Sequence, residues 1–272
     1  MKLGVQVVLN ELKIEEKLSR VREYGFDYFQ LCVWNQSFMR KDVADEILET
    51  CKKYDLKISS LWCGWSGPTA WNFTEGPITL GLVPPEYRFQ RMKDLMLGSD
   101  FAKMLGVDKM ATHVGFIPEN LTDPNYLPVV AAVKTVAKYC KKNGQYFLFE
   151  TGQETPVTLL RIIEDLECDN LGLNYDTANL ILYGKANPVD GLDVVGKYVM
   201  DVHAKDGDYP TNGKSLGKEK KIGDGKVDFR GVIEKLKALG YEGTITIERE
   251  ISGEQQIKDI IESKAYLETL IG

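Results

Sequence analysis

Gln145-Tyr-Phe-Leu-Phe-Glu150-Thr-Gly-Gln-Glu154-Thr-Pro156 is an apolar run that ends on a carboxylate and is followed at once by Gly and Pro. A short apolar run bounded by turn residues is typical of a buried strand, so Glu150 is expected where strand gives way to loop. The same unit recurs on both sides, because further apolar runs alternate with amphipathic segments of helix length. We predict strands over 3–9, 28–34, 57–63, 109–115, 146–150, 171–176, 198–204 and 243–248.

Strict alternation of strands and helices over roughly 250 residues is the pattern of a closed parallel (β/α)8 TIM barrel. No linker or shift in composition divides the chain, so we predict one domain over 1–272. A doubly wound open sheet is the alternative, although the G-x-G-x-x-G sequence that often follows its first strand is absent. Glycines fall at four predicted helix ends, where a left-handed residue suits the turn into the next strand: Gly25, Gly106, Gly144 and Gly240.

Composition and charge limit the class of protein. The 272 residues are 43% hydrophobic and 27% charged, as in a globular chain, and the net charge of -6 disfavours a nucleic-acid partner. The first ten residues enter a strand pattern directly, without a basic leader or a long apolar segment, so we expect a cytoplasmic protein with no membrane partner. The five cysteines contain no C-x-x-C pair, which predicts reduced, mostly buried thiols.

Four consecutive predicted strands end on side chains that can bind a metal ion: Glu150, Asp176, His203 and Glu248. One polar residue at a strand end is explained equally well by the strand meeting solvent, but four in succession favour a shared site. Adjacent strands lie about 4.8 Å apart, so these side chains can converge on one ion. Three carboxylates and one imidazole are mostly hard ligands, which favours Mn²⁺, with Mg²⁺, Co²⁺ or Zn²⁺ as alternatives.

Several motifs together resemble those of a known family. They are Glu150-Thr-Gly-Gln-Glu154-Thr-Pro156, Asp176-Thr-Ala-Asn179, His203-Ala-Lys205-Asp206, Gly223-Asp-Gly-Lys-Val-Asp228-Phe and Gly240-Tyr-Glu-Gly-Thr-Ile-Thr-Ile-Glu248. In order and spacing they resemble the sugar phosphate isomerase/epimerase family of xylose isomerase-like TIM barrels, which includes ketose 3-epimerases and endonuclease IV. The resemblance covers essentially the whole chain.

The resemblance implies that the four strand-end residues bind one divalent ion, and that Glu150 and Glu248 also flank the substrate as general acid and base. It implies an isomerase that epimerises or isomerises a ketose, keto-sugar or sugar phosphate through a metal-stabilised enediolate, in a homo-oligomer (dimer or tetramer). The chain departs from the free-ketose 3-epimerases, which tend to have His at the position of Asn179 and Arg near that of Lys205.

Two other activities are compatible with the same family. The first is a metal-dependent lyase acting on 3-keto-glycosides, because the same enolisation beside a ketone can expel a leaving group. The second is an endonuclease IV-like nuclease, which the acidic net charge and the presence of only two histidines disfavour.

Candidate contacts with a small-molecule sugar or sugar derivative are His113, Glu154, Trp62, Asn179 and Lys205. His113 could bind a hydroxyl group or serve as a structural histidine. Glu154 could orient a hydroxyl group or face solvent at the start of a helix. Trp62 could form a wall for a sugar ring or pack between a loop and the barrel. Lys205 could contact substrate oxygens or lie on the surface. Two long loops, 62–83 and 205–227, follow strand ends and are candidate lids.

Overall fold

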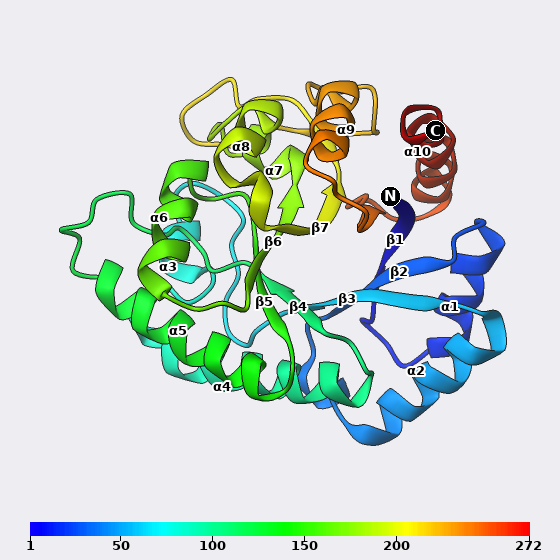
Figure 1. Cartoon of the computed structure of the whole chain (residues 1–272), viewed down its shortest axis with the longest axis horizontal. Coiled ribbons are helices and arrows are strands. Elements are labelled where there is room, and N and C mark those ends of the chain that lie inside the picture. Colours follow the sequence, from blue (N-terminus) through cyan, green and yellow to red (C-terminus); the bar gives the residue numbers. More distant parts are fainter.

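Each of the eight apolar runs forms a parallel strand of one barrel in the computed structural model, which describes residues 1–272 (Figure 1). The strands are β1 (Lys2–Val8), β2 (Tyr28–Val33), β3 (Lys57–Cys63), β4 (Lys109–Thr112), β5 (Tyr146–Glu150), β6 (Leu171–Asp176), β7 (Val199–Ala204) and β10 (Thr244–Ile247). The last strand pairs with the first, with Lys2 opposite Thr244, and this pairing closes the barrel. The predicted TIM barrel is therefore confirmed, and the open-sheet alternative is wrong.

Eight helices form the outer layer around the strands (Figure 1). They are α1 (Ile14–Glu23), α2 (Lys41–Tyr54), α4 (Pro85–Met104), α5 (Tyr126–Lys142), α6 (Pro156–Leu166), α8 (Pro188–Val195), α9 (Phe229–Ala238) and α10 (Glu254–Ile271). The start of α6 shows how local sequence begins a helix. Thr155 caps α6 by accepting a hydrogen bond from the Thr158 amide, and Pro156 occupies the first turn, where its missing N–H costs nothing.

The glycines at the helix ends adopt the backbone conformation that their positions require. Gly25, Gly106, Gly144 and Gly240 have φ angles of 79°, 69°, 76° and 71°, the left-handed region that residues with a Cβ avoid. Each follows a helix and is itself followed by a strand, as the sequence predicts. Two of these helices, α4 and α5, pack directly against the strands that follow them, β4 and β5.

One strand, β4, is three residues shorter than predicted. β4 ends at Thr112, although its apolar pattern continues to residue 115. The chain leaves the barrel there because the Val114 carbonyl accepts a hydrogen bond from the Leu82 amide in the long loop after β3, at 2.7 Å, and Gly115 turns the backbone with φ 97°. The sequence pattern could not reveal this pairing, which depends on a loop some thirty residues away.

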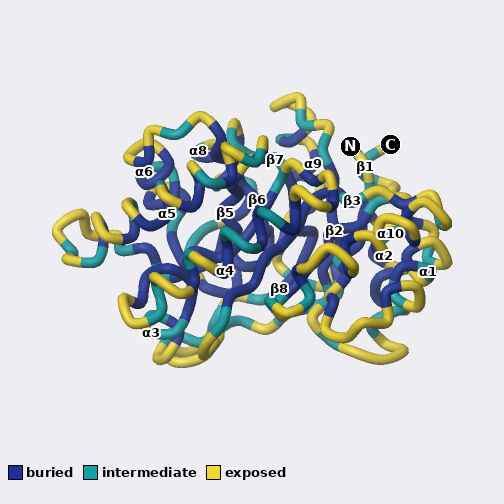
Figure 2. Tube along the Cα trace, turned by 90° about the horizontal axis from the view of Figure 1, so that it is seen from below, coloured by how far each residue is buried: buried dark blue, intermediate teal, exposed yellow.

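The main apolar core lies between the strands and the helices, and contains 59 buried residues. Figure 2 shows this layer as the buried part of the trace, with the exposed residues on the outer helices and loops. Four cysteines are buried and Cys168 is partly exposed, and all five are free thiols, as expected. None of the helices combines the length and the apolar character needed to cross a bilayer.

Two loops and their short elements rise above the carboxyl ends of the strands. The loop after β3 contains the short helix α3 (Gly76–Thr79). The loop after β7 contains a small antiparallel hairpin of β8 (Asp206–Gly207) and β9 (Glu219–Lys220). A further short helix, α7 (Thr177–Leu182), directly follows β6. Single 3₁₀ turns, η1 (Gln36–Phe38) and η2 (Gly196–Tyr198), complete the chain.

Candidate metal and substrate site

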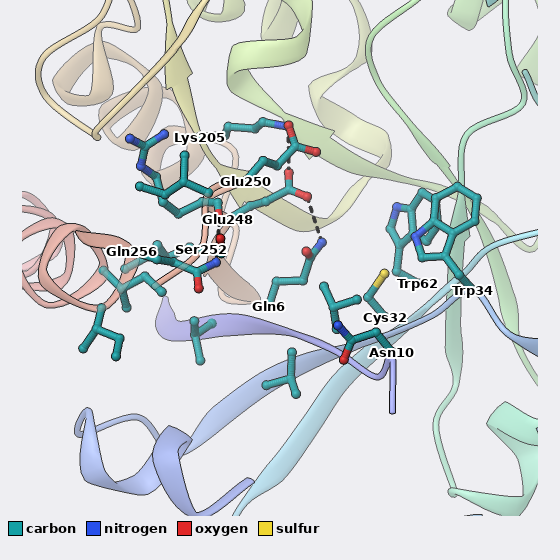
Figure 3. Close-up of a pocket in the computed structure, with 18 of the residues that line it drawn as sticks. Gln6, Asn10, Cys32, Trp34, Trp62, Lys205, Glu248, Glu250, Ser252 and Gln256 are labelled. Carbon is teal, nitrogen blue, oxygen red and sulfur yellow. Dashed lines mark hydrogen bonds and ion pairs between the residues drawn. The ribbon is translucent and has the colours of Figure 1, made fainter. Parts of the chain in front are cut away.

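A cavity of about 930 Å³ opens at the carboxyl ends of the strands, where barrels of this type place their chemistry. Figure 3 shows the aromatic rings of Trp34 and Trp62 on one side of it, and the acidic and basic side chains of Glu248, Glu250 and Lys205 on the other. The volume lies within the range of small-molecule sites, which is about 300–1,000 Å³.

The four strand-end residues converge on one point. Ligand atoms of Glu150, Asp176, His203 and Glu248 all lie within 4.8 Å of one another, and all four residues are buried. His203 Nδ1 is at the centre, 3.0 Å from Glu150 Oε1, 3.2 Å from Glu248 Oε2 and 3.7 Å from Asp176 Oδ2. Successive side chains of a strand point to opposite faces. Each of the four residues occupies a strand-end position whose side chain points into the barrel.

The cluster leaves carboxylate oxygens without hydrogen-bond donors. Asp176 Oδ1 caps helix α7 by accepting from the Asn179 amide at 2.7 Å, whereas Asp176 Oδ2 has no hydrogen-bond partner. Glu248 Oε1 accepts from Gln6 Nε2 at 2.9 Å, whereas Glu248 Oε2 makes no hydrogen bond and has only the ion-pair neighbours His203 Nδ1 and Lys205 Nζ, each at 3.2 Å. Buried polar atoms are rarely left unpaired, so these two oxygens fit a site whose remaining partner is a cation.

Burial and neighbouring charges shift the pKa values of the two glutamates in opposite directions. Burial raises the pKa of Glu150 to about 7, although the nearby charge of His203 opposes the rise. Burial also acts to raise the pKa of Glu248, but the charges of Lys205 and His203 outweigh it and lower that pKa well below the ordinary value. The cluster therefore contains one carboxyl that holds a proton near neutral pH and one that releases it readily.

Lys205 brings a buried positive charge to the edge of the cluster. Its Nζ lies 3.2 Å from Glu248 Oε2, 2.8 Å from Glu250 Oε2 and 3.9 Å from Asp176 Oδ2. The residue is 2% exposed, so the interpretation of Lys205 as a surface residue is wrong. A charged lysine is buried only where acidic partners compensate it, and here they are Glu250 and two of the proposed ligands, Glu248 and Asp176.

All four tryptophans of the chain gather on the opposite side of the cavity: Trp34, Trp62, Trp65 and Trp71. Trp34 packs against Trp62 with ring centroids 4.9 Å apart, and the Trp62 indole N–H donates to Glu150 Oε2. Trp62 thus touches the cluster directly, which packing between a loop and the barrel does not require. Flat apolar faces beside polar groups suit a sugar ring, whose C–H face is apolar.

His113 and Asn179 complete the wall between the cluster and the tryptophans. His113 Nε2 lies 3.6 Å from Glu150 Oε1, and burial lowers the pKa of His113 to about 3, so its imidazole is neutral. The ring packs against Trp71 with centroids 5.1 Å apart. Asn179 Oδ1 accepts from Lys205 Nζ at 3.5 Å. Both residues line the cavity.

Glu154 lies deeper than the other candidate substrate contacts. It is 3% exposed, so the interpretation in which it faces solvent is wrong, but it is absent from the residues that line the cavity. Its Oε1 atom has no hydrogen-bond partner. Burial raises the pKa of Glu154 to about 8, which makes the protonated acid its dominant form at neutral pH.

Glu154→Gln is expected to change how stability depends on pH. Between about pH 4.5 and pH 8 folded Glu154 keeps a proton that the unfolded chain releases, so this residue lowers the free energy of unfolding as pH rises. The glutamine side chain binds no proton, so the variant does not lose stability in this way as pH rises. At pH 5 the variant should match the wild type, and at pH 8 it should be more stable by an amount on the order of a few kcal/mol.

Urea unfolding at pH 5 and pH 8 measures this difference. Exposed Glu164→Gln on the following helix is the matched control and should leave the pH dependence of the wild type unchanged. If Glu154→Gln has the same pH slope as the wild type, Glu154 does not carry a proton in the folded state.

The loop after β3 is fixed from below by one buried arginine. Arg91, from α4, is fully buried, and its guanidinium donates to the main-chain carbonyls of Ser66 at 3.0 Å and Pro68 at 2.8 Å. It also donates to the carbonyls of Thr79 and Gly81 at 2.7 and 2.8 Å. The guanidinium lies 5.4 Å from the ring of Trp65. Arg91 therefore holds together both ends of the loop that carries Trp65 and Trp71.

Sequence reasoning missed four residues that build the site: Gln6 and Gln30 beside the cluster, Trp71 in the cavity wall, and Arg91 beneath the loop after β3. The two glutamines had a usable signal, because each is a polar residue inside an otherwise apolar strand and at a position that alternation directs into the barrel. Arg91 had none, because a lone arginine in a helix usually lies on the surface. Trp71 lies in a loop whose path the sequence does not specify.

Comparisons with known proteins agree with this geometry. Residues 18–270 match the sequence profile described as xylose isomerase-like TIM barrel. The structure of a xylose isomerase domain protein from Planctomyces limnophilus is 30% identical, superposes with a TM-score of 0.92, and aligns over 99% of this chain and 96% of that one. An uncharacterized protein from Methanocaldococcus jannaschii is 26% identical over 98% of this chain and 88% of its own length.

A D-tagatose 3-epimerase-like protein shares the fold at lower identity. It is 22% identical, with a TM-score of 0.78 and alignment over 100% of this chain and 97% of that one. The profile match spans most of the chain and includes all four residues of the buried cluster. The chain belongs to the xylose isomerase-like TIM barrel family.

Proposed function

We propose that this chain is a divalent-metal-dependent isomerase that epimerises or isomerises a ketose, keto-sugar or sugar phosphate. The observation that carries the proposal is the convergence of two buried glutamates, Glu150 and Glu248, with Asp176 and His203 beside one cavity. The pKa values of the two glutamates are shifted in opposite directions. Pairs of titratable groups pushed apart in this way are characteristic of acid–base catalysis. The likeness to a D-tagatose 3-epimerase-like protein supports a sugar as the substrate.

The residues present fit a divalent cation. Glu150, Asp176, His203 and Glu248 would hold it, and Asp176 Oδ2 and Glu248 Oε2, which make no hydrogen bond, would gain a partner. The ligand set is mostly hard, which favours Mn²⁺, with Mg²⁺, Co²⁺ or Zn²⁺ as alternatives. When bound, such an ion polarises the substrate carbonyl and offsets the negative charge that develops on its oxygen.

Proton transfer then follows from the state of the two glutamates. Glu248 is ionised, because the charge of Lys205, 3.2 Å away, stabilises it, so Glu248 would remove the proton from the carbon beside the carbonyl. Burial favours the protonated form of Glu150, which would return its proton to the enediolate. Return to the opposite face of the same carbon inverts that centre, and return to the neighbouring carbon converts ketose to aldose. The Trp62 N–H orients Glu150 throughout.

The cavity wall supplies groups for the rest of the substrate. Trp62 would pack against the apolar face of the sugar, and neutral His113 and Asn179 would bind its hydroxyl groups. Lys205 would stabilise negative charge on a substrate oxygen while keeping Glu248 ionised. Glu154, protonated and buried below the wall, would support these groups or donate to a hydroxyl that reaches it. A cytoplasmic location and a homo-oligomeric state remain predictions.

Exchange with deuterated solvent tests the proposal. Mn²⁺-loaded protein is incubated in D₂O with free ketoses, ketose phosphates and 3-keto-glucosides, and NMR detects deuterium at the carbon beside the carbonyl. We expect exchange together with formation of an epimer or aldose. Loss of the glycosidic substituent in place of epimerisation would identify a lyase, and cleavage of abasic DNA would identify a nuclease. Absence of exchange with every sugar contradicts the proposed function.

A further inference from the structure

The imidazole of His203 has a partner on each of its two nitrogens. Nδ1 faces the three carboxylates, and Nε2 lies 2.6 Å from Gln30 Oε1 on β2. Because an amide oxygen only accepts, Nε2 must carry the hydrogen. In the neutral ring Nδ1 is then the nitrogen with a free lone pair, and it points toward the carboxylates.

The orientation of the Gln30 amide is set by its own surroundings. Gln30 Nε2 donates to Ser60 Oγ at 3.0 Å and to Asn174 Oδ1 at 3.3 Å. The Ser60 hydroxyl hydrogen is used in turn, because Ser60 Oγ donates to Asp201 Oδ2 at 2.5 Å. A flipped amide would bring its oxygen against Ser60 Oγ, whose hydrogen is already donated to Asp201, so Oε1 is the atom that faces His203.

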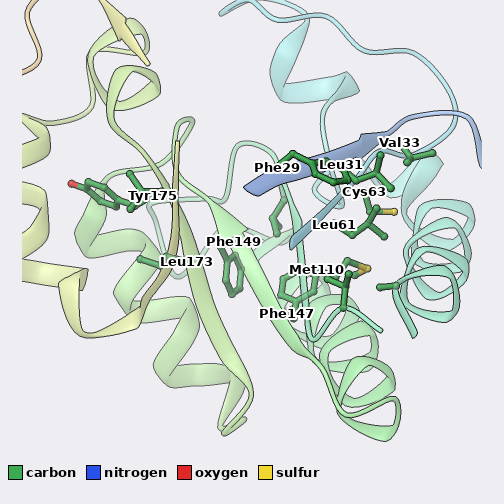
Figure 4. Close-up of a cluster of buried hydrophobic side chains, with 14 of the residues drawn as sticks. Phe29, Leu31, Val33, Leu61, Cys63, Met110, Phe147, Phe149, Leu173 and Tyr175 are labelled. Carbon is green, nitrogen blue, oxygen red and sulfur yellow. The ribbon is translucent and has the colours of Figure 1, made fainter. Parts of the chain in front are cut away.

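Strand alternation and two irregularities of the barrel place these residues inside it. Phe29 and Leu31, on either side of Gln30, point into the apolar core, as Figure 4 shows, so Gln30 faces the interior. The register between β2 and β3 shifts opposite Gln30, where β3 has an extra residue beside Ser60. The register between β6 and β7 shifts directly before Asp201. Bulges next to active sites commonly redirect a side chain.

We propose that Gln30 is a positioning residue for the metal centre, the last member of a buried relay that runs from Asp201 through Ser60 to His203. The relay fixes the tautomer and the ring plane of His203, so that Nδ1 is presented to the ion. It also gives a role to Asp201, a fully buried carboxylate that contacts no basic side chain. The inference rests on the proposed function only in requiring a divalent ion at the cluster.

An amide suits this position better than the carboxylate that often orients a metal-binding histidine. Three carboxylates already surround His203 Nδ1, and a fourth in contact with Nε2 would add negative charge to a buried site. Gln30 accepts the same hydrogen bond without that charge. The negative end of the relay lies two hydrogen bonds further away, at Asp201.

Metal affinity tests the relay. Gln30→Met keeps the length of the side chain and removes the acceptor, so calorimetric titration with Mn²⁺ should show a Kd about 10- to 100-fold higher than the wild type. Ser60→Ala frees the Gln30 amide to rotate, and a smaller rise in Kd is expected. Gln145→Met is the matched control: Gln145 is a buried glutamine bonded to Ser99, outside the cluster, and its loss should leave Kd unchanged.

Nitrogen NMR gives a readout that a general loss of packing would not reproduce. The chain has only two histidines, so ¹⁵N-histidine labelling of the Mg²⁺-loaded protein yields two imidazoles, and His113→Gln assigns them. The wild type should show a hydrogen on Nε2 of His203, and Gln30→Met should lose or shift that signal. Wild-type Kd in both Gln30→Met and Ser60→Ala overturns the inference, as does an Nε2 without hydrogen. Metal binding without sugar turnover would contradict only the proposed function.

Discussion

Glu248→Gln is expected to lower the rate of deuterium exchange beside the carbonyl by about 10²- to 10⁴-fold, the usual contribution of a positioned acid or base. The amide cannot take up the proton that ionised Glu248 removes. Its Oε1 can still accept from Gln6 Nε2, and three other ligands remain, so the variant should bind Mn²⁺ more weakly but measurably. The variant therefore separates loss of the base from loss of the metal.

Glu250→Gln is the matched control for this experiment. Glu250 shares Lys205 with Glu248, but its side chain is 58% exposed and it lies outside the metal cluster. The control should retain most of the exchange rate. Exchange is measured at saturating Mn²⁺, and Mn²⁺ binding is measured by titration of the same preparations. Unchanged exchange in Glu248→Gln would remove Glu248 from the mechanism, even if the remaining ligands hold the ion as expected.

The barrel could be predicted from sequence because each strand is recognisable from its local pattern of apolar residues and turn residues. β5 is an apolar run closed by Thr151 and Gly152, and every barrel strand lies at or within a residue or two of its predicted range except β4. β4 was overestimated because Val114 pairs with the loop residue Leu82. Local patterns specify which residues form a strand, but the strand ends also depend on partners distant in sequence.

The convergence of the four cluster residues could be predicted for a related reason. Parallel strands bring their carboxyl ends to one edge, so Glu150, Asp176 and His203 needed only their strand positions to be placed together. The buried relay beneath them could not be predicted in the same way. It depends on register shifts beside Ser60 and Asp201, which leave no recognised trace in sequence. Polar residues do stand two positions before three of the four cluster residues: Asn174, Asp201 and Thr246.

Arg91→Met is expected to lower the free energy of unfolding by about 3 kcal/mol or more, because it leaves four carbonyls of the loop after β3 without their donor. The apolar length of methionine fills part of the space, so the loss reflects hydrogen bonding more than an empty volume. For a chain of this size the urea midpoint should fall by about 1 M. The loop should also lose the geometry that places Trp65 and Trp71 against the cavity.

Arg161→Met is the appropriate comparison, since Arg161 donates to a single main-chain carbonyl, that of Glu119, in an exposed setting. Its substitution should cost less than about 1 kcal/mol. Arg91→Lys keeps the charge but not the planar guanidinium, so its loss of unfolding free energy should lie between those of Arg91→Met and Arg161→Met. Because Arg91 does not touch the cluster, Arg91→Met should keep the Mn²⁺ affinity of the wild type while KM for the sugar rises. Equal stability of Arg91→Met and Arg161→Met would show that the loop holds its shape without the buried guanidinium.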